Sequence, residues 1–437
     1  MSEAFSQIGS KTQMYSKEEV DRITKYPGEP MFTFSAISDI HLRVEDSTND
    51  DAGHDDLKNL FKVLGNRQRD MGLNLKYIFC AGDIGYDSKI GEIRAFNNIV
   101  TNHCPISFDN VFSCNGNHDR GHSIADWKNH MFSESNQLDV TDEKNFTHTD
   151  GNFVFAFMSL RQDAPSPNRS DLYTQYYFSE TSETEEWLRG VVADSAGKAL
   201  ILFMHYPFIN RKCFDINKTD LVIYDFETDA DILQSIPTAE LNIPYAGLAD
   251  GGGNGDKSYS MVTYHGWRVD PSDSFDYENP TEWERIIEIL KGHQGGKTIV
   301  FSGHTHFAFE CEDYNQIWGK GYANINVAPI VDFDASTRKY TDTGITTVHI
   351  PSLNYPRQFK GSSSTFPGAV TGYSTISGAN PYRQPCQSWL VDVYEDKLIL
   401  RGFESWVAHN KKYGDILDKY IYTIDLMASE EEDVDNG

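Results

Sequence analysis

Short apolar runs, each followed by a polar motif, recur along the chain. They are rich in Ile, Val, Phe and Leu, and they lie at residues 31–37, 75–81, 111–112, 153–160, 199–204 and 298–302. Continuous apolar runs of this length, bounded by turn-forming residues, are typical of fully buried strands. The pattern therefore predicts six core strands.

Helical periodicity separates several of these runs. Apolar residues recur at helical spacing in about residues 55–71 and 90–102. Two further helices are predicted by capping boxes, which pair Ser182 with Glu185 and Thr281 with Glu284. Alternating strands and helices imply a mostly parallel sheet, and such sheets bind ligands at the carboxyl ends of their strands.

The C-terminal part has a different pattern. Polar and apolar residues alternate at 345–350, 389–393 and 398–403, which predicts strands. The last two stretches flank a turn at Glu395 and Asp396, so we expect them to form a hairpin. The chain therefore combines a βα-alternating part with a β-rich end.

We expect one large domain at residues 31–427 with additions at its ends and inside it. We expect residues 1–30 to form a polar N-terminal arm and residues 428–437 to form an acidic, disordered tail. The periodicity fails at about 208–279, and a structureless loop of that length would be unusual, so an inserted subdomain or lid is predicted there. A second insertion is expected at about 311–388.

Polar side chains follow five of the predicted strands. Any one of them could be an ordinary turn residue or helix cap. Together, at the carboxyl ends of separate strands, they predict a metal site. The candidates are Asp39, His41, Asp83, Asn117, His118, Asp119, His205, His304 and His306. A mixed set of Asp, Asn and His suits first-row divalent or trivalent metals, and it exceeds what one ion needs, so we expect two ions.

Composition narrows the possible partners. The chain has 437 residues, is 39% hydrophobic and has a formal net charge of −27. This charge disfavours nucleic acid and anionic membranes as partners. No stretch approaches the roughly 20 apolar residues of a membrane span, and no secretory signal is evident. The scattered cysteines, such as Cys80 and Cys114 at strand ends, fit free thiols. We therefore expect a cytoplasmic location; the oligomeric state stays open.

The motifs carry a family resemblance. Asp39-x-His41, Gly82-Asp83, Gly116-Asn117-His118-Asp119, His205 and Gly303-x-x-His306 resemble the five ordered blocks of the calcineurin-like metallophosphoesterase superfamily. The resemblance spans about residues 32–310. It implies an α/β fold, a four-layer α/β/β/α sandwich of two mixed β-sheets flanked by helices, here with large loop insertions.

The resemblance also implies a role for each motif residue. Asp39, His41 and His306 would hold one transition-metal ion, Asn117, His205 and His304 would hold a second, and Asp83 would bridge them. The ions would be Mn, Fe or Zn. His118 would protonate the leaving oxygen or stabilise the phosphoryl charge, and Asp119 would orient His118.

The predicted function is a metallophosphoesterase. It would hydrolyse a phosphodiester or phosphomonoester bond of a small molecule through in-line attack by a metal-bridging hydroxide. The third motif ends in Asp119 rather than Glu, and the second motif lacks the arginine-bearing extension of phosphoprotein phosphatases. Both differences favour the phosphodiesterase-like and small-molecule branches. A nuclease and a non-catalytic metal-binding scaffold remain alternatives.

Other residues have two interpretations each. Arg120, Arg161 and Arg357 could contact phosphate or be ordinary surface arginines. Tyr86 and Tyr206 adjoin the motifs, where they could line the substrate pocket or pack in the core.

Overall fold

The computed structural model describes fifteen stretches of the chain. These are residues 28–44, 54–133, 138–163, 176–179, 182–206, 220–223, 234–237, 282–304, 309, 326–334, 339–353, 359–360, 369–370, 386–408 and 411–426. Several predicted features lie outside these stretches. They are the arm up to residue 27, the acidic tail, most of both predicted insertions, Arg357 and His306. The capping box predicted at Thr281 and Glu284 also lies outside the described residues, because Thr281 and the side chain of Glu284 are not among them.

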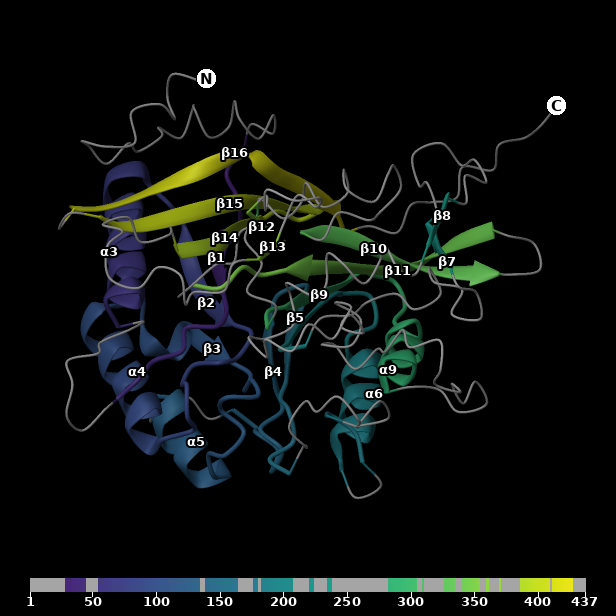
Figure 1. Ribbon diagram of the computed structural model, residues 1–437, viewed down its shortest axis with the longest axis horizontal. Coiled ribbons are helices and arrows are strands. Elements are labelled where there is room, and N and C mark those ends of the chain that lie inside the picture. The colour runs from purple at the N-terminus through teal and green to yellow at the C-terminus, as the bar shows by residue number, and fades with distance from the viewer. Residues whose placement is uncertain are drawn as a thin grey trace.

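Two six-stranded sheets form the centre of the molecule (Figure 1). The first contains, in spatial order, β16 (Lys411–Asp425), β15 (Lys397–Ala408), β14 (Cys386–Val393), β1 (Phe32–Ile37), β2 (Leu75–Cys80) and β3 (Val111–Ser113). The second contains β10 (Val327–Asp334), β11 (Lys339–His349), β9 (Thr298–Ser302), β6 (Ala199–Met204), β5 (Phe153–Met158) and β4 (Phe146–Asp150).

Both sheets are mixed. In the first, β1, β2 and β3 are parallel, while β14, β15 and β16 extend the sheet by antiparallel pairing. In the second, β5, β6, β9 and β11 are parallel, and β4 and β10 are antiparallel edge strands. The parallel strands deliver their carboxyl ends to the same region, which places the polar motifs together.

Aromatic side chains join the two sheets. The ring of Phe34 on β1 lies 6.0 Å from Phe155, 6.3 Å from Phe203 and 5.8 Å from Phe301, all at steep interplanar angles. Edge-to-face pairs of this kind stabilise beyond their buried area by about 0.5–1.5 kcal/mol each. The sheets therefore pack face to face around an aromatic core.

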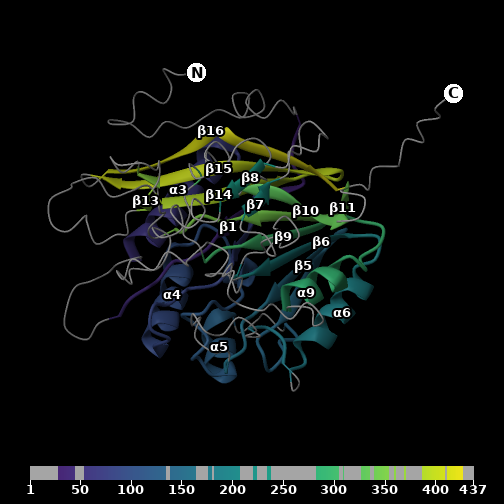
Figure 2. The ribbon, with the colours of Figure 1, turned by 45° about the vertical axis from the view of Figure 1, so that its right-hand side comes forward.

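Helices cover the outer faces of both sheets (Figure 2). On the first sheet lies α3 (His54–Met71), next to α4 (Ile90–His103) and α5 (Ile124–Met131). On the second lie α6 (Thr184–Asp194) and α9 (Glu282–Leu290). Along β6, Ile201 and Phe203 face the other sheet, whereas Leu200 and Leu202 pack in the cluster that contains α6 and α9. The predicted fold class of two mixed sheets flanked by helices is confirmed.

The described core elements agree closely with the predicted ones. All six predicted core strands form, with ends shifted by two residues at most, and the hairpin around Glu395 and Asp396 joins β14 to β15. Other elements were not predicted, among them β4, β16 and α5. The strands β10 and β11 belong to the second sheet although they fall within the range 311–388 predicted as an insertion.

The capping box predicted at Ser182 and Glu185 is wrong. The residue that precedes α6 is Glu183, which makes no side-chain cap. Ser182 Oγ instead accepts a hydrogen bond from the Thr184 amide at 3.1 Å, and Glu185 forms an ion pair with Arg189 at 2.8 Å. The helix starts one residue later than the motif requires.

Several short elements lie between the main strands and helices. A 3-10 turn at Phe108–Asn110 leads into β3. Within the first predicted insertion β7 (Asp220–Ile223) pairs with β8 (Gln234–Pro237), and within the second β12 (Phe359–Lys360) pairs with β13 (Ala369–Val370). Cys80 and Cys114 are free and buried, as predicted. Within the described stretches, no helix has the length and apolar character needed to cross a bilayer.

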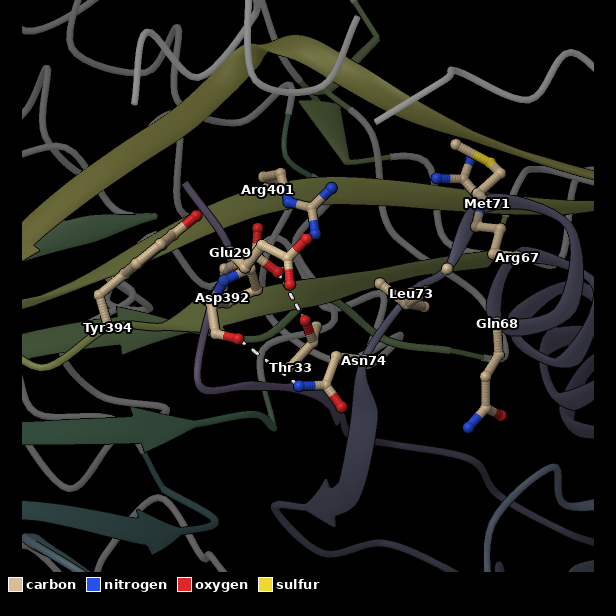
Figure 3. A pocket seen from close by; sticks show the side chains of 12 residues that line it. Glu29, Thr33, Arg67, Gln68, Met71, Leu73, Asn74, Asp392, Tyr394 and Arg401 are labelled. Carbon is tan, nitrogen blue, oxygen red and sulfur yellow. Dashed lines mark hydrogen bonds and ion pairs between the residues drawn. The ribbon is translucent and has the colours of Figure 1, made fainter. Parts of the chain in front are cut away.

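A cavity of about 440 Å³ lies at the end of β1 opposite the polar motifs (Figure 3). Its most polar part is a buried cluster in which Asp392 Oδ1 accepts hydrogen bonds from Thr33 at 2.7 Å and from Arg401 at 2.6 Å. The guanidinium-bearing residues Arg67 and Arg401 are only 2% and 3% exposed. These two guanidinium groups are therefore buried in the wall, and we interpret the cluster as a cross-link between β1, β14 and β15.

Candidate metal centre

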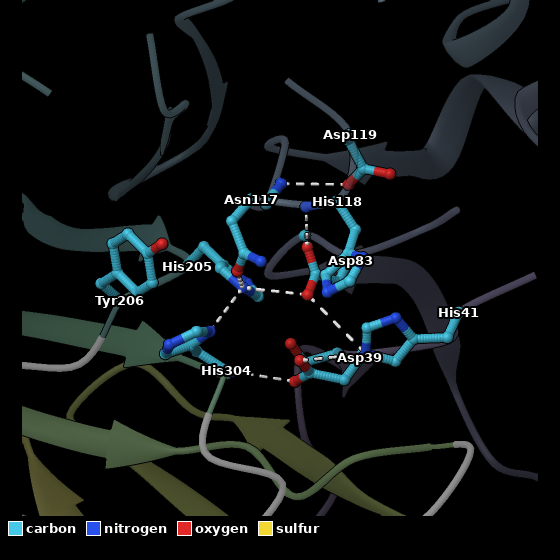
Figure 4. Close-up of polar contacts among 12 residues, drawn as sticks. Asp39, His41, Asp83, Asn117, His118, Asp119, His205, Tyr206 and His304 are labelled. Atoms are coloured by element: carbon cyan, nitrogen blue, oxygen red, sulfur yellow. Dashed lines mark hydrogen bonds and ion pairs between the residues drawn. The ribbon is translucent and has the colours of Figure 1, made fainter. Parts of the chain in front are cut away.

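The loops that follow five strands converge on one site (Figure 4). Asp39 and His41 follow β1, Asp83 follows β2, and the loop after β3 carries Asn117, His118 and Asp119; His205 and His304 follow β6 and β9. The site therefore draws on both sheets. Eight of the nine predicted site residues are described here, and the ninth, His306, lies outside the described residues.

Asp83 lies at the middle of this site. Its Oδ2 atom is 3.7 Å from His41 Nε2 and 3.2 Å from His205 Nε2. Two sets of potential ligand atoms lie within 4.8 Å of one another: one from His41, Asp83 and His118, the other from Asp83, His205 and His304. The two sets share Asp83, which is the arrangement that a bridging carboxylate requires.

The ring nitrogens of His205 have distinct environments. Nδ1 lies 2.8 Å from the carbonyl oxygen of Ala81, and a carbonyl can only accept, so Nδ1 carries the proton. When the ring is neutral, Nε2 then presents a lone pair to the site. It lies 2.9 Å from Asn117 Oδ1 and 3.2 Å from His304 Nδ1. Lone-pair atoms that converge in a buried region need a cation among them, so these residues fit a metal ion.

The pKa shifts of His205 and Asp83 agree with a metal site around Asp83. Burial alone would lower the pKa of His205, but the Asp83 carboxylate beside it raises the pKa to about 9. Burial opposes ionisation of Asp83, yet His205, His118 and His41 hold its pKa well below the usual range. An ionised carboxylate surrounded by imidazoles is a group that a metal can bind by displacing protons.

The backbone is strained at the same positions. Asp39, His41, Asp83 and His304 have positive φ angles of 53°, 50°, 53° and 71°. Left-handed conformations at non-glycine residues cost about 1–3 kcal/mol and cluster at functional sites. Backbone hydrogen bonds hold them, including those from the amides of Ile40 and His41 to the Asp83 carbonyl at 2.8 and 3.0 Å. The fold therefore specifies where these side chains point.

Two glycines allow the loops to approach one another. A Cβ atom on Gly116 would lie 2.1 Å from Asp83 Oδ1, and one on Gly303 would lie 1.8 Å from Ser38 Oγ. Real Cβ contacts are never this short. The glycines of the third and fifth motifs are therefore required by close packing around Asp83 and Asp39.

His118 is held by the main chain of a neighbouring loop. Its Nδ1 atom donates to the carbonyl oxygen of Tyr86 at 2.5 Å, and its amide donates to Asp83 Oδ1 at 2.9 Å. The first bond fixes the proton on Nδ1, so Nε2 is the nitrogen that can exchange protons with a ligand. Burial lowers the pKa of His118, but Asp83 and the Tyr86 carbonyl outweigh it and raise that pKa.

Asp119 makes different contacts from those predicted. Its carboxylate accepts hydrogen bonds from the amides of Ile84, Gly85 and Gly116 at 3.0, 2.8 and 3.0 Å. The His118 ring is oriented by Tyr86 instead. Burial, followed by the charge of Asp83, raises the pKa of Asp119 to about 7 against the pull of these amides. Asp119 therefore ties the second motif to the third and orients His118 only through the backbone.

The family model described as calcineurin-like phosphoesterase matches residues 32–233. Residues 32–233 are therefore similar to the calcineurin-like phosphoesterase family. The match contains the first four motifs, from Asp39 to His205, and the structure adds His304 from the strand β9 beyond it.

Solved structures give weaker likenesses. Vacuolar protein sorting 29 from Cryptosporidium parvum is 10% identical, with a TM-score of 0.28, and the match covers 91% of this chain and 100% of that one. A single mutant of Vps29 from Entamoeba histolytica is 8% identical, with a TM-score of 0.25. That match covers 90% of this chain and 99% of the Vps29 chain. No curated protein sequence matches the chain.

Beside the phosphoesterase motifs lies an arginine that the sequence did not single out. The guanidinium carbon of Arg43 is 3.6 Å from the centre of the Tyr86 ring, and that ring is 5.2 Å from the ring of His118. Tyr86 is 36% exposed, so it lines the rim of the site, whereas Tyr206 is buried and packs against His304. The one available signal for Arg43 was its position two residues after His41.

The predicted phosphate contact of Arg161 is not supported. Its guanidinium donates to the carbonyl of Phe178 at 2.7 Å and to Asp163 at 2.9 Å. Those bonds link loops on the second sheet. Arg120 lies next to the third motif, and its carbonyl oxygen accepts from Lys144 at 3.5 Å.

Proposed function

We propose that this protein is a dinuclear metal-dependent phosphoesterase that hydrolyses a phosphodiester or phosphomonoester of a small molecule. The observation that carries the proposal is the position of Asp83, which belongs to both sets of ligand atoms. The family match adds support because its residues contain the first four motifs.

Each side chain has a task in this proposal. Asp39, His41 and His306 would hold one ion with Asp83, and Asn117, His205 and His304 would hold the other. Mn, Fe and Zn all suit this mixture of imidazole, amide and carboxylate ligands. When bound, two such ions lower the pKa of water and offset the charge of the phosphoryl group.

His118 is the proposed acid. Because Nδ1 is fixed on the Tyr86 carbonyl, a second proton would reside on Nε2, and this proton would pass to the leaving oxygen as its bond to phosphorus breaks. The raised pKa of His118 keeps a larger share of the ring protonated near neutral pH than an ordinary histidine would have. Asp119 keeps the loop of His118 against the loop of Asp83.

Charge supports a small substrate. A formal net charge of −27 repels a polyanion such as nucleic acid, whose binding depends on basic surface contacts. A small phosphoester needs only a local group of cations, which two metal ions, His118 and the nearby Arg43 would supply.

Hydrolysis of two chromogenic substrates tests the proposal. Bis(p-nitrophenyl) phosphate reports phosphodiesterase activity and p-nitrophenyl phosphate reports phosphomonoesterase activity. We expect hydrolysis of at least one with Mn²⁺, loss of activity with EDTA, and recovery with added metal. Folded protein that hydrolyses neither with Mn²⁺, Fe²⁺ or Zn²⁺ would refute the proposal, and rapid degradation of DNA would favour the nuclease alternative.

A further inference from the structure

Three consecutive backbone amides are bound by one buried carboxylate. Glu282, the first residue of α9, accepts from Tyr176 at 2.8 Å and from Tyr177 and Phe178 at 2.6 Å each. Glu282 is 6% exposed. A carboxylate with three amide donors is a strong, directional anchor. It fixes the segment Tyr176–Phe178, called the 176–178 segment below.

The side chain of Tyr177 connects this segment to the backbone of His205, a proposed metal ligand. Its hydroxyl oxygen accepts from the amide of His205 at 3.2 Å and from the amide of Tyr206 at 3.0 Å. Tyr177 is fully buried. Since a buried amide without an acceptor is destabilising, the loop after β6 is held where this oxygen lies.

A second contact reaches His304. The ring of Tyr206 packs edge-on against His304, with centroids 4.3 Å apart (Figure 4). It also packs against the ring of Tyr176, with centroids 4.9 Å apart. The 176–178 segment therefore contacts the surroundings of two histidines. Both belong to the ligand set that contains Asp83, His205 and His304.

Two of these contacting residues, Tyr206 and Glu282, flank the predicted insertion in the sequence. Tyr206 is the last described residue before the predicted insertion, and Glu282 is the first residue of the helix after it. The chain leaves the metal centre at one end of the insertion and returns to the 176–178 segment at the other. The same three residues therefore bind both ends.

We propose that Tyr177 and Glu282 are positioning residues for the ion held by Asn117, His205 and His304. The inference rests on the proposed function. Glu282 fixes the 176–178 segment, Tyr177 fixes the backbone of His205, and the ligand set on this side of Asp83 loses its geometry when either is altered. The set that contains His41 lies on the other side of Asp83 and does not depend on them.

Cobalt titration of the full chain tests this. Visible absorption and calorimetry report two Co²⁺ sites separately in wild-type protein, in Tyr177→Phe and in Glu282→Gln. Outer groups of this kind typically change metal affinity by about 10–100-fold. We expect each variant to weaken one ion at least tenfold, with an altered spectrum, and to leave the other ion within twofold.

Val192→Ala is the matched control, because Val192 packs on α6 in the same hydrophobic cluster and its side chain forms no hydrogen bonds. It should lower Tm and leave both affinities within twofold. If Tyr177→Phe and Glu282→Gln lower Tm as the control does, but keep both Co²⁺ affinities and the spectrum, the positioning role is wrong while the proposed function stands. Wild-type protein that binds no pair of ions would overturn both.

Discussion

Nε2 of His205 lies 3.2 Å from Oδ2 of Asp83, although neither atom has a proton to donate when the imidazole is neutral. The other ring nitrogen donates to the Ala81 carbonyl, which leaves a lone pair on Nε2. A lone pair and a carboxylate at this distance repel each other unless a proton or a metal ion lies between them. This contact links the fold most directly to the proposed chemistry.

Replacing His118 tests the proposed acid. His118→Asn should lower kcat by about 10²–10⁴-fold, since general acids contribute that much, and should leave bound metal unchanged. Metal content by elemental analysis and initial rates on bis(p-nitrophenyl) phosphate provide the measurement. A variant with full activity would show that His118 is not the acid, even if the enzyme class is right.

Gly116 provides a steric test of the centre. Gly116→Ala adds a Cβ atom 2.1 Å from Asp83 Oδ1, so we expect Asp83 to shift and metal affinity to fall at least tenfold. Gly190→Ala is the control, because Gly190 is an exposed helix residue with no atom within 4 Å of the added carbon. It should stabilise α6 by about 0.5–1 kcal/mol. Equal metal affinity in both variants would contradict the close approach.

Asp119 should matter more for stability than for the acid itself. Asp119→Ala leaves three buried amides without their acceptor, which we expect to cost about 3–5 kcal/mol of unfolding free energy. Asp119→Asn keeps one acceptor oxygen and should cost less. Urea unfolding of both variants measures this. If the alanine variant unfolds at the wild-type urea concentration, the loops are held by other contacts.

His122 gives a prediction about pH. Burial lowers its pKa to about 4, with Lys144 and His130 acting in the same direction and Asp126 against it. Below pH 6.5, His122 therefore binds a proton in the unfolded state but not in the folded state. The free energy of unfolding falls as pH drops from 6.5 towards 4. We expect a loss of about 2 kcal/mol from this residue. His122→Gln should remove that part of the slope in urea unfolding at pH 7.5 and 5.0; an unchanged slope would contradict the assignment.

Most of the described core and the site were predictable from local signals. Strands such as β6 and β9 are continuous apolar runs, and their ends carry His205 and His304 within two residues. Since parallel strands share one direction, residues at their carboxyl ends meet, and short motifs sufficed to place them. His306 stays a prediction, because it lies outside the described residues.

The remaining features depend on contacts distant in sequence. Nothing near Asp119 indicates that its carboxylate binds the amides of Ile84 and Gly85, and the role predicted for it assumed a contact with its neighbour His118 instead. Glu282 reaches Tyr177 across 105 positions. Side-chain to backbone bonds of this range have no periodicity and no motif, so only the folded chain reveals them.

The central claim is that two ions share Asp83, and anomalous diffraction from crystals grown with Mn²⁺ tests it most directly. We expect two manganese peaks on either side of the Asp83 carboxylate, roughly 3.5–4 Å apart, one beside His41 and the other beside His205. Asp83→Asn crystals should show weaker occupancy at both positions. A single peak, or manganese bound elsewhere on a fully folded chain, would contradict the account.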